Sequence, residues 1–170
     1  MSELIDPNVE ENERRPQFLK VLCILSFISI GMNFIFSLGG LLTGPTTEED
    51  MLDRKVESAT SISELKDVGM YSMAELMAKL ERMAIEVNDS FYFATLISLI
   101  TIGIGLYGVL KMWAGAKIGF HLYIIYCLLS IGAVYLYVSP SNIPSMVVIF
   151  NLLLSGMFVL MYSRNLKWMR

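Results

Sequence analysis

The sequence predicts an all-α polytopic membrane protein, a four-transmembrane-helix bundle with an acidic helical loop between spans one and two. Three observations lead to this fold class. Hydrophobic residues make up 55% of the 170 residues and charged residues only 17%, whereas a soluble domain has about 25% charged residues. The last acidic residue is Asp89, and the residues after it include five Lys or Arg, one His and no acid. Four uncharged stretches are also long enough to cross a bilayer. Together these features exclude an ordinary soluble enzyme, a nucleic-acid binder with a basic face and a disordered tail protein.

The four spans follow from length, because a bilayer core about 30 Å thick needs about 20 apolar helical residues. The first stretch is too long for the core of a removable signal peptide and is followed by no A-x-A cleavage pattern, so we expect a permanent helix. All five prolines lie outside the span interiors, where they would break a helix. The expected elements in order are a polar tail at 1–16, span one at 17–42, the loop at 43–90, spans two to four at 91–111, 117–138 and 143–163, and a basic tail at 164–170.

Basic residues predict the orientation, since Lys and Arg are enriched on the cytoplasmic side of a membrane. Eight of the 13 basic residues lie in or next to the N-terminal tail, the turn between spans two and three, and the C-terminal tail. The loop holds the other five together with 11 acids. We therefore expect both termini to be cytoplasmic and the loop to lie outside. Aromatic residues agree, with Trp113, Tyr162 and Trp168 at the inner boundary and Tyr135 and Tyr137 at the outer one.

The loop is expected to be helical near 47–58, 62–68 and 72–88, with Gly69 as a break. Hydroxyl residues followed three positions later by an acid predict the helix starts, as in Thr47 and Asp50 or Ser61 and Glu64. The sequence leaves open whether the last helix continues into span two or breaks at Asn88, Asp89 and Ser90. That helix carries an apolar stripe at three- and four-residue steps, for which we expect protein contact rather than a lipid surface because the loop is acidic. The candidate contact residues are Met70, Met73, Leu76, Met77, Leu80, Ala84 and Val87.

Residues 103–108 match the pattern G-x-G-x-x-G, but a dinucleotide site needs a strand before it and a helix after it. Within a span, glycines instead allow helices to pack closely. The candidate small residues are Thr101, Gly105, Gly108, Gly115 and Gly119.

The other polar span residues are weighed in the same way. His121 is the only histidine and is expected about one turn inside the inner end of span three, where an interfacial anchor or interhelical hydrogen bond is favoured over catalysis. Asn33 and Asn151 can bridge helices. Cys23 and Cys127 fall inside spans, which argues against disulfide oxidoreductases with cysteines facing outward.

The titratable groups needed for several activities are missing. No Asp or Glu lies in any span, which opposes proton-coupled transport and acid–base catalysis. The methionines Met70, Met73 and Met77 could bind Cu(I), but an adaptable apolar surface is the preferred interpretation. The row Glu49, Asp53 and Glu57 is interpreted as a solvated acidic face. We therefore expect no cofactor, no metal and no catalytic residue.

A short segment near the N-terminus resembles a known group of proteins, and the resemblance implies a source organism. The segment RPQFLKVLCILSFI at 15–28 resembles the start of a group of uncharacterised small four-span membrane proteins of Bacteroidota. The amino-acid sequence is similar over about 14 residues, and beyond them only the order of spans and loop is similar. The resemblance implies a bacterial inner membrane with the loop in the periplasm. It implies no activity or site.

These observations lead to a function hypothesis and an alternative. The expected role is a non-catalytic accessory or scaffold subunit, whose partners are the lipid bilayer and either other membrane protein subunits or further copies of itself, with no nucleic acid. The alternative is a small oligomeric channel or permease with Asn33, Ser37 and Asn151 along its route. A metal-handling or redox enzyme that uses His121 and the methionines is the least favoured interpretation.

Overall fold

The computed structural model describes residues 16–170, so the predicted polar tail at 1–16 lies outside the described residues except for Pro16. The described part is helical and contains no β-strand. Its elements are α2 (Gln17–Thr43), α3 (Glu48–Asp67), α4 (Tyr71–Asp89), α5 (Phe91–Trp113), α6 (Ile118–Gly132), the 3₁₀ turns η1 (Ala133–Leu136) and η2 (Pro140–Asn142), and α7 (Ser145–Ser163).

Four of these helices are long and apolar enough to cross a membrane. They are α2, α5, α6 with η1, and α7, which matches the predicted all-α polytopic bundle. The third span combines 15 residues of α-helix with four of 3₁₀-helix. The longer rise of the 3₁₀ turn brings this element to about 30 Å, the thickness of a bilayer core.

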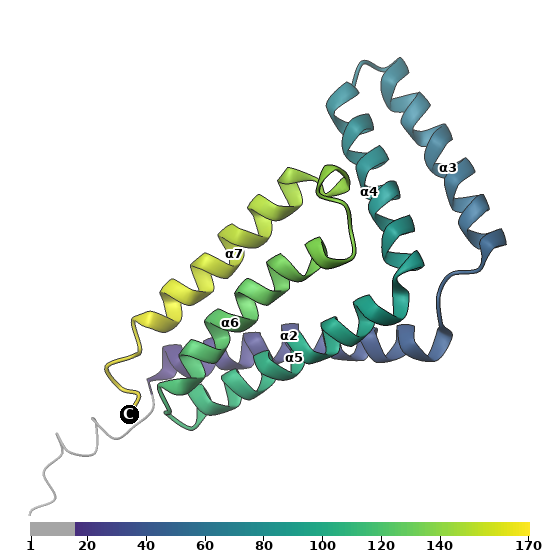
Figure 1. The fold of residues 1–170 in the computed structure, drawn as a ribbon. Helices are drawn as coiled ribbons and strands as arrows, with labels where there is room; N and C mark the ends of the chain where they lie inside the picture. Colours follow the sequence, from purple (N-terminus) through teal and green to yellow (C-terminus); the bar gives the residue numbers. More distant parts are fainter. Residues whose placement is uncertain (1–15) are drawn as a thin grey trace, which may run out of the picture.

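The spans form two pairs (Figure 1). α2 and α5 run side by side, and α6 and α7 form a second pair that diverges from the first. α5 is the central helix because it packs against both α2 and α6, whereas α7 packs mainly on α6. We call the end of the bundle from which α3 and α4 project the hairpin end, and the end that holds Gln17 and Arg170 the terminal end.

The loop between spans one and two is a helical hairpin of α3 and α4, with two helices rather than three. The predicted separate helices at 47–58 and 62–68 are wrong, because α3 is continuous from Glu48 to Asp67. No Gly or Pro interrupts residues 58–62, and the Thr60 hydroxyl donates to the Val56 carbonyl at 3.0 Å, within the helix. Of the hydroxyl and acid pairs, Thr47 does cap α3, since its Oγ1 accepts from the Asp50 amide at 3.2 Å.

Two backbone positions separate the helices of this region. Gly69 has φ of +79° and ends α3, as expected of a residue that favours the left-handed region. Ser90 has a non-helical backbone conformation, with φ −104° and ψ 22°. It separates α4 from α5, so α4 does not continue into span two. The Asn88 side chain holds this corner, because it accepts from the Thr46 amide at 2.7 Å and donates to the Thr46 carbonyl at 3.2 Å.

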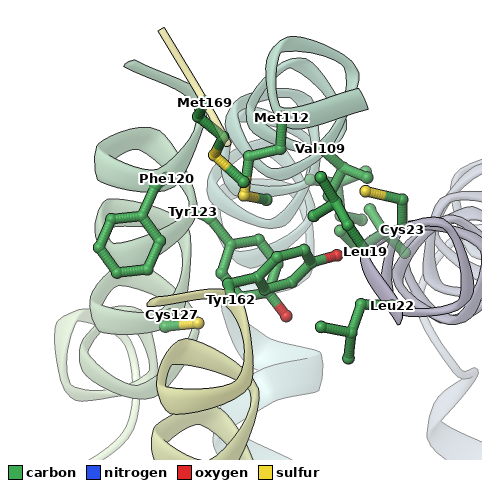
Figure 2. Packing of buried hydrophobic residues seen from close by; sticks show 12 residues of the cluster. Leu19, Leu22, Cys23, Val109, Met112, Phe120, Tyr123, Cys127, Tyr162 and Met169 are labelled. Carbon is green, nitrogen blue, oxygen red and sulfur yellow. The ribbon is translucent and has the colours of Figure 1, made fainter. Parts of the chain in front are cut away.

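The core occupies the terminal end of the bundle (Figure 2). Leu19, Cys23, Val109, Met112 and Tyr162 are fully buried there. The C-terminal segment completes this core, since Met169 is also buried in it. Arg170 closes the segment onto the α5–α6 turn: its amide donates to the Gly115 carbonyl at 2.7 Å, and its carbonyl accepts from the Lys117 amide at 3.0 Å.

Candidate functional site

A polar cavity of about 400 Å³ lies among the four spans. Every span contributes to its wall, with Asn33 from α2, Thr101 from α5, Tyr126 from α6 and Asn151 from α7. None of the lining side chains carries a charge. The polar lining residues are Ser26, Ser29, Asn33, Ser98, Thr101, Tyr123, Tyr126, Cys127, Ser130, Tyr137, Asn151 and Ser155.

The cavity is closed toward the terminal end. Ser26 lines the cavity there, and its hydroxyl group lies 2.9 Å from that of the fully buried Tyr162. The Tyr123 ring, which also lines the cavity, stacks at a tilt on Tyr162 with centroids 4.9 Å apart. On the terminal side of these residues lies the fully buried core that includes Leu19 and Met112 (Figure 2). Side chains packed this closely leave little room for water.

Toward the hairpin end the cavity is open. Asn33 and Asn151 line it and are both exposed. The last helix gives it little cover, since only 6% of the apolar stretch of α7 is buried within the bundle, against 33% for α5. The cavity is therefore a one-ended recess in the wall of the bundle rather than a pore through it.

The two asparagines present hydrogen-bonding groups to this recess. The Asn33 Nδ2 donates to the Ser29 carbonyl at 2.8 Å, and the Asn151 Nδ2 donates to the Val147 carbonyl at 3.0 Å. Each bond lies within its own helix and uses one amide hydrogen. The Oδ1 atoms of Asn33 and Asn151 accept no hydrogen bond from any residue in 16–170. A polar atom without a partner at membrane depth is costly, so these oxygens need a donor from water or from a bound molecule.

Glu86 fixes the hairpin to the turn between α6 and α7. Its Oε2 accepts from the Ser139 amide at 2.6 Å and its Oε1 from the Asn142 Nδ2 at 2.7 Å. The hydrogen bond from the Ser139 amide lowers the pKa of the Glu86 carboxyl below its ordinary value, because it stabilises the ionised form. α4 thus spans the gap between the two pairs of helices at the hairpin end (Figure 1).

The predicted small residues lie between α5 and α6 of the same chain, apart from Thr101. A Cβ on Gly119 would lie 2.5 Å from the Gly108 carbonyl oxygen, and a Cβ on Gly105 would lie 2.6 Å from the Tyr126 ring. Gly115 has φ of +82° in the α5–α6 turn, and a Cβ added to it would lie 3.0 Å from the Trp168 ring. These glycines therefore serve packing within the chain, and only Thr101 of the predicted set borders the cavity.

His121 lies apart from the cavity, exposed in the first turn of α6, with Nδ1 3.1 Å from the Lys117 carbonyl oxygen. The predicted loop stripe is partly covered. Four of its residues line an apolar groove of about 580 Å³ beside α3, while Leu76 is half-buried and Met70 and Met73 are exposed near the hairpin tip. The four groove residues are Met77, Leu80, Ala84 and Val87.

Sequence reasoning missed three features of this region. Tyr162 is interpreted from the sequence as an interfacial aromatic, yet it is fully buried and shares a hydrogen bond with Ser26. Met169 is assigned to a basic tail but belongs to the core. Glu86 gives no local signal, because its partners lie 53 and 56 residues away. No protein-family model, curated protein or solved structure matches the chain.

Proposed function

We propose that this chain is a non-catalytic accessory subunit of a larger membrane complex, with the α3–α4 hairpin as its docking element. The observation that carries the proposal is the hairpin tip. Val68 and Tyr71 are 70% and 68% exposed there, and Met70 and Met73 are exposed beside them. Exposed apolar side chains clustered on a projecting element are typical of a protein-interaction site.

The anchoring of the hairpin supports the same role. Asn88 binds the loop before α3, and Glu86 binds the α6–α7 turn, so α4 is attached to the bundle at two separate places. A tip held in a fixed position loses little conformational entropy when a partner binds. The acidic first turn of α3, with Glu48, Glu49 and Asp50, gives the base of the hairpin a negative surface.

Native purification in mild detergent tests this proposal. The double variant Val68→Ser and Tyr71→Ser is expected to lose the co-purifying subunit while its unfolding temperature stays the same. Ser72→Ala, which changes an exposed polar side chain in the same turn, serves as the matched control and is expected to retain the subunit. A chain that purifies as a lone monomer from native membranes, or a tip variant that keeps its partner, would overturn the proposal.

We further propose the inner membrane of a bacterium as the location, with both termini in the cytoplasm. The support is the basic charge of the terminal end, where Lys20, Lys111, Lys117 and Arg164 lie. The resemblance at 15–28 supports the bacterial source. In intact spheroplasts, an impermeant maleimide is expected to label Ser61→Cys in the hairpin and to leave Lys167→Cys unlabelled. The opposite labelling would reverse the orientation.

A small channel or permease is a second candidate, and one observation favours it: Asn33 and Asn151 border the same cavity. The closed terminal end opposes conduction through this conformation of a single chain. If solute crosses the protein, Asn33→Leu is expected to reduce flux into liposomes that contain the purified protein. Unchanged flux would remove that residue from any route.

A further inference from the structure

We propose that the cavity among the spans binds an uncharged hydroxyl-bearing amphiphile of the diacylglycerol class, taken from the surrounding bilayer. The head group would occupy the cavity and the acyl chains would remain among lipid. This role is separate from docking by the hairpin, because the cavity and the hairpin tip share no residue.

The absence of charged side chains in the cavity lining favours an uncharged ligand. Its lining contains hydroxyl, amide and thiol groups but no Lys, Arg, His, Asp or Glu. A phosphate-bearing head group would bring a negative charge into a low-dielectric recess without a cation to pair with it, which is strongly unfavourable. Phospholipids and free inorganic ions therefore suit this site poorly.

The hydrogen-bonding groups select a ligand with a hydroxyl. The Oδ1 atoms of Asn33 and Asn151 need donors, as described above. The phenol groups of Tyr126 and Tyr137 also line the cavity and hydrogen-bond to no residue in 16–170, so they can donate to ester carbonyls. A diacylglycerol has one hydroxyl, which can donate to one of the two Oδ1 atoms, and two esters, which can accept from the two phenols, while water can donate to the other oxygen. A ligand with acceptors only would give neither asparagine oxygen a donor.

The shape and access of the cavity select an amphiphile. The buried packing around Ser26 and Tyr162 closes the terminal end, while the recess is open toward the hairpin end and, where α7 gives little cover, toward the bilayer. Apolar Ile97, Leu154 and Phe158 lie in the wall and can contact the first methylenes of an acyl chain. A volume of about 400 Å³ is in the range of small-molecule sites and holds a glycerol diester head but not two long chains.

Photolabelling of the full chain in phosphatidylcholine nanodiscs tests the proposal. The probe is a diacylglycerol with a diazirine placed next to one ester group. Labelled residues are identified by mass spectrometry and are expected to include cavity residues such as Ser98, Thr101 and Ser155. The same probe with its hydroxyl methylated, and a phosphatidylcholine with the same diazirine, serve as ligand controls and are expected to label the cavity about tenfold less, because each fails to donate to the asparagines.

A pair of variants adds an independent test. Asn33→Leu with Asn151→Leu is expected to reduce cavity labelling by about tenfold, the loss of one neutral hydrogen bond from the ligand hydroxyl, without lowering the unfolding temperature. Phe36→Leu with Leu153→Ile changes exposed side chains on the same two helices and is expected to leave labelling unchanged. Equal labelling by the methylated probe, preference for phosphatidylcholine, or absence of cavity labelling in the unmodified chain would each overturn the proposal, even if a variant failed to fold.

Discussion

Gly108 and Gly119 bring the backbones of α5 and α6 into direct contact. A Cβ at Gly119 would lie 2.5 Å from both the Gly108 carbonyl oxygen and the Met112 amide nitrogen. Neither of these backbone atoms can move aside as the end of a flexible side chain would, so the helices must separate to admit even one methyl group. In contrast, Gly103 has no atom within 4 Å of its hypothetical Cβ, although it belongs to the same glycine pattern.

This difference predicts opposite outcomes for two similar substitutions. Gly119→Ala is expected to destabilise the protein by about 1–3 kcal/mol, the usual cost of overpacking. Gly103→Ala is expected to leave stability unchanged or to raise it by up to about 1 kcal/mol through helix propensity. Thermal unfolding of both variants in the same detergent measures the difference. Equal stability of the two variants would contradict the close approach of α5 and α6.

The buried hydroxyl pair of Ser26 and Tyr162 leads to a second prediction at this scale. Removing one hydroxyl deprives its partner of this buried hydrogen bond. Ser26→Ala and Tyr162→Phe are each expected to cost roughly 1 kcal/mol. The double variant is expected to cost less than the sum, because the two hydroxyl groups lose the same bond. Additive effects in the double-mutant cycle would show that the pair does not interact.

Among the elements, α4 has two structural roles. It is one arm of the hairpin, and through Glu86 it also holds the turn between α6 and α7. Among the described residues, Glu86 supplies the side-chain hydrogen bonds that join this turn to the hairpin, in addition to the packing of α6 and η1 against α5. The Ser139 amide and the Asn142 side-chain amide are both donors, so the bond requires the ionised form of Glu86.

The attachment is therefore expected to depend on pH. Since the pKa of Glu86 lies below its ordinary value of 4.5 in the folded protein, the stabilisation is fully present above that value. It is lost as the pH falls through the lowered pKa, when the carboxyl becomes protonated. Because the intrinsic exchange rate of an amide also changes with pH, the quantity to measure is the protection factor of the Ser139 amide, its intrinsic rate divided by its observed rate. This protection factor is expected to fall under those acidic conditions. Glu86→Leu, which removes both acceptor oxygens, is expected to show low protection of the Ser139 amide already at neutral pH, whereas protection that stays high in this variant would contradict the role of Glu86.

The elements also show why sequence reasoning succeeds in some places and fails in others. Span lengths and the break at Gly69 are local properties, governed by bilayer thickness and backbone conformation, and the sequence predicts them. The break at Ser90 is one of two alternatives that the sequence leaves open, and the backbone of the folded chain decides between them. The false break within α3 arose because Ser61 and Glu64 have the spacing of a helix cap, although no Gly or Pro stops the preceding turns. A hydroxyl and acid pair is compatible with both a helix start and a helix interior.

At the scale of the whole molecule, the sequence could not predict the cavity, because it depends on how distant segments face one another. The channel alternative groups Asn33, Ser37 and Asn151 along one route, and the fold places Asn33 and Asn151, but not Ser37, in the wall of one recess. In the same way, the pattern of glycines could not distinguish Gly103, which contacts nothing, from Gly119, which contacts α5. The distribution of basic and acidic residues along the sequence describes the ends of the molecule, whereas side-chain packing determines the arrangement of its interior.

The asymmetry of the bundle, closed at the terminal end and open toward the hairpin, depends on the C-terminal segment. Met169 is 1% exposed and belongs to the same core as Cys23, which is fully buried.

Met169→Ala is expected to destabilise the protein by about 2–5 kcal/mol through the cavity that it leaves. Because water can then reach the core from the terminal end, Cys23 is expected to react faster with a small maleimide, as measured by mass spectrometry. Lys167→Ala, at an exposed position two residues earlier, is the matched control and is expected to leave Cys23 unreactive. If Met169→Ala also left both stability and Cys23 reactivity unchanged, residues 164–170 would not be the element that closes this end.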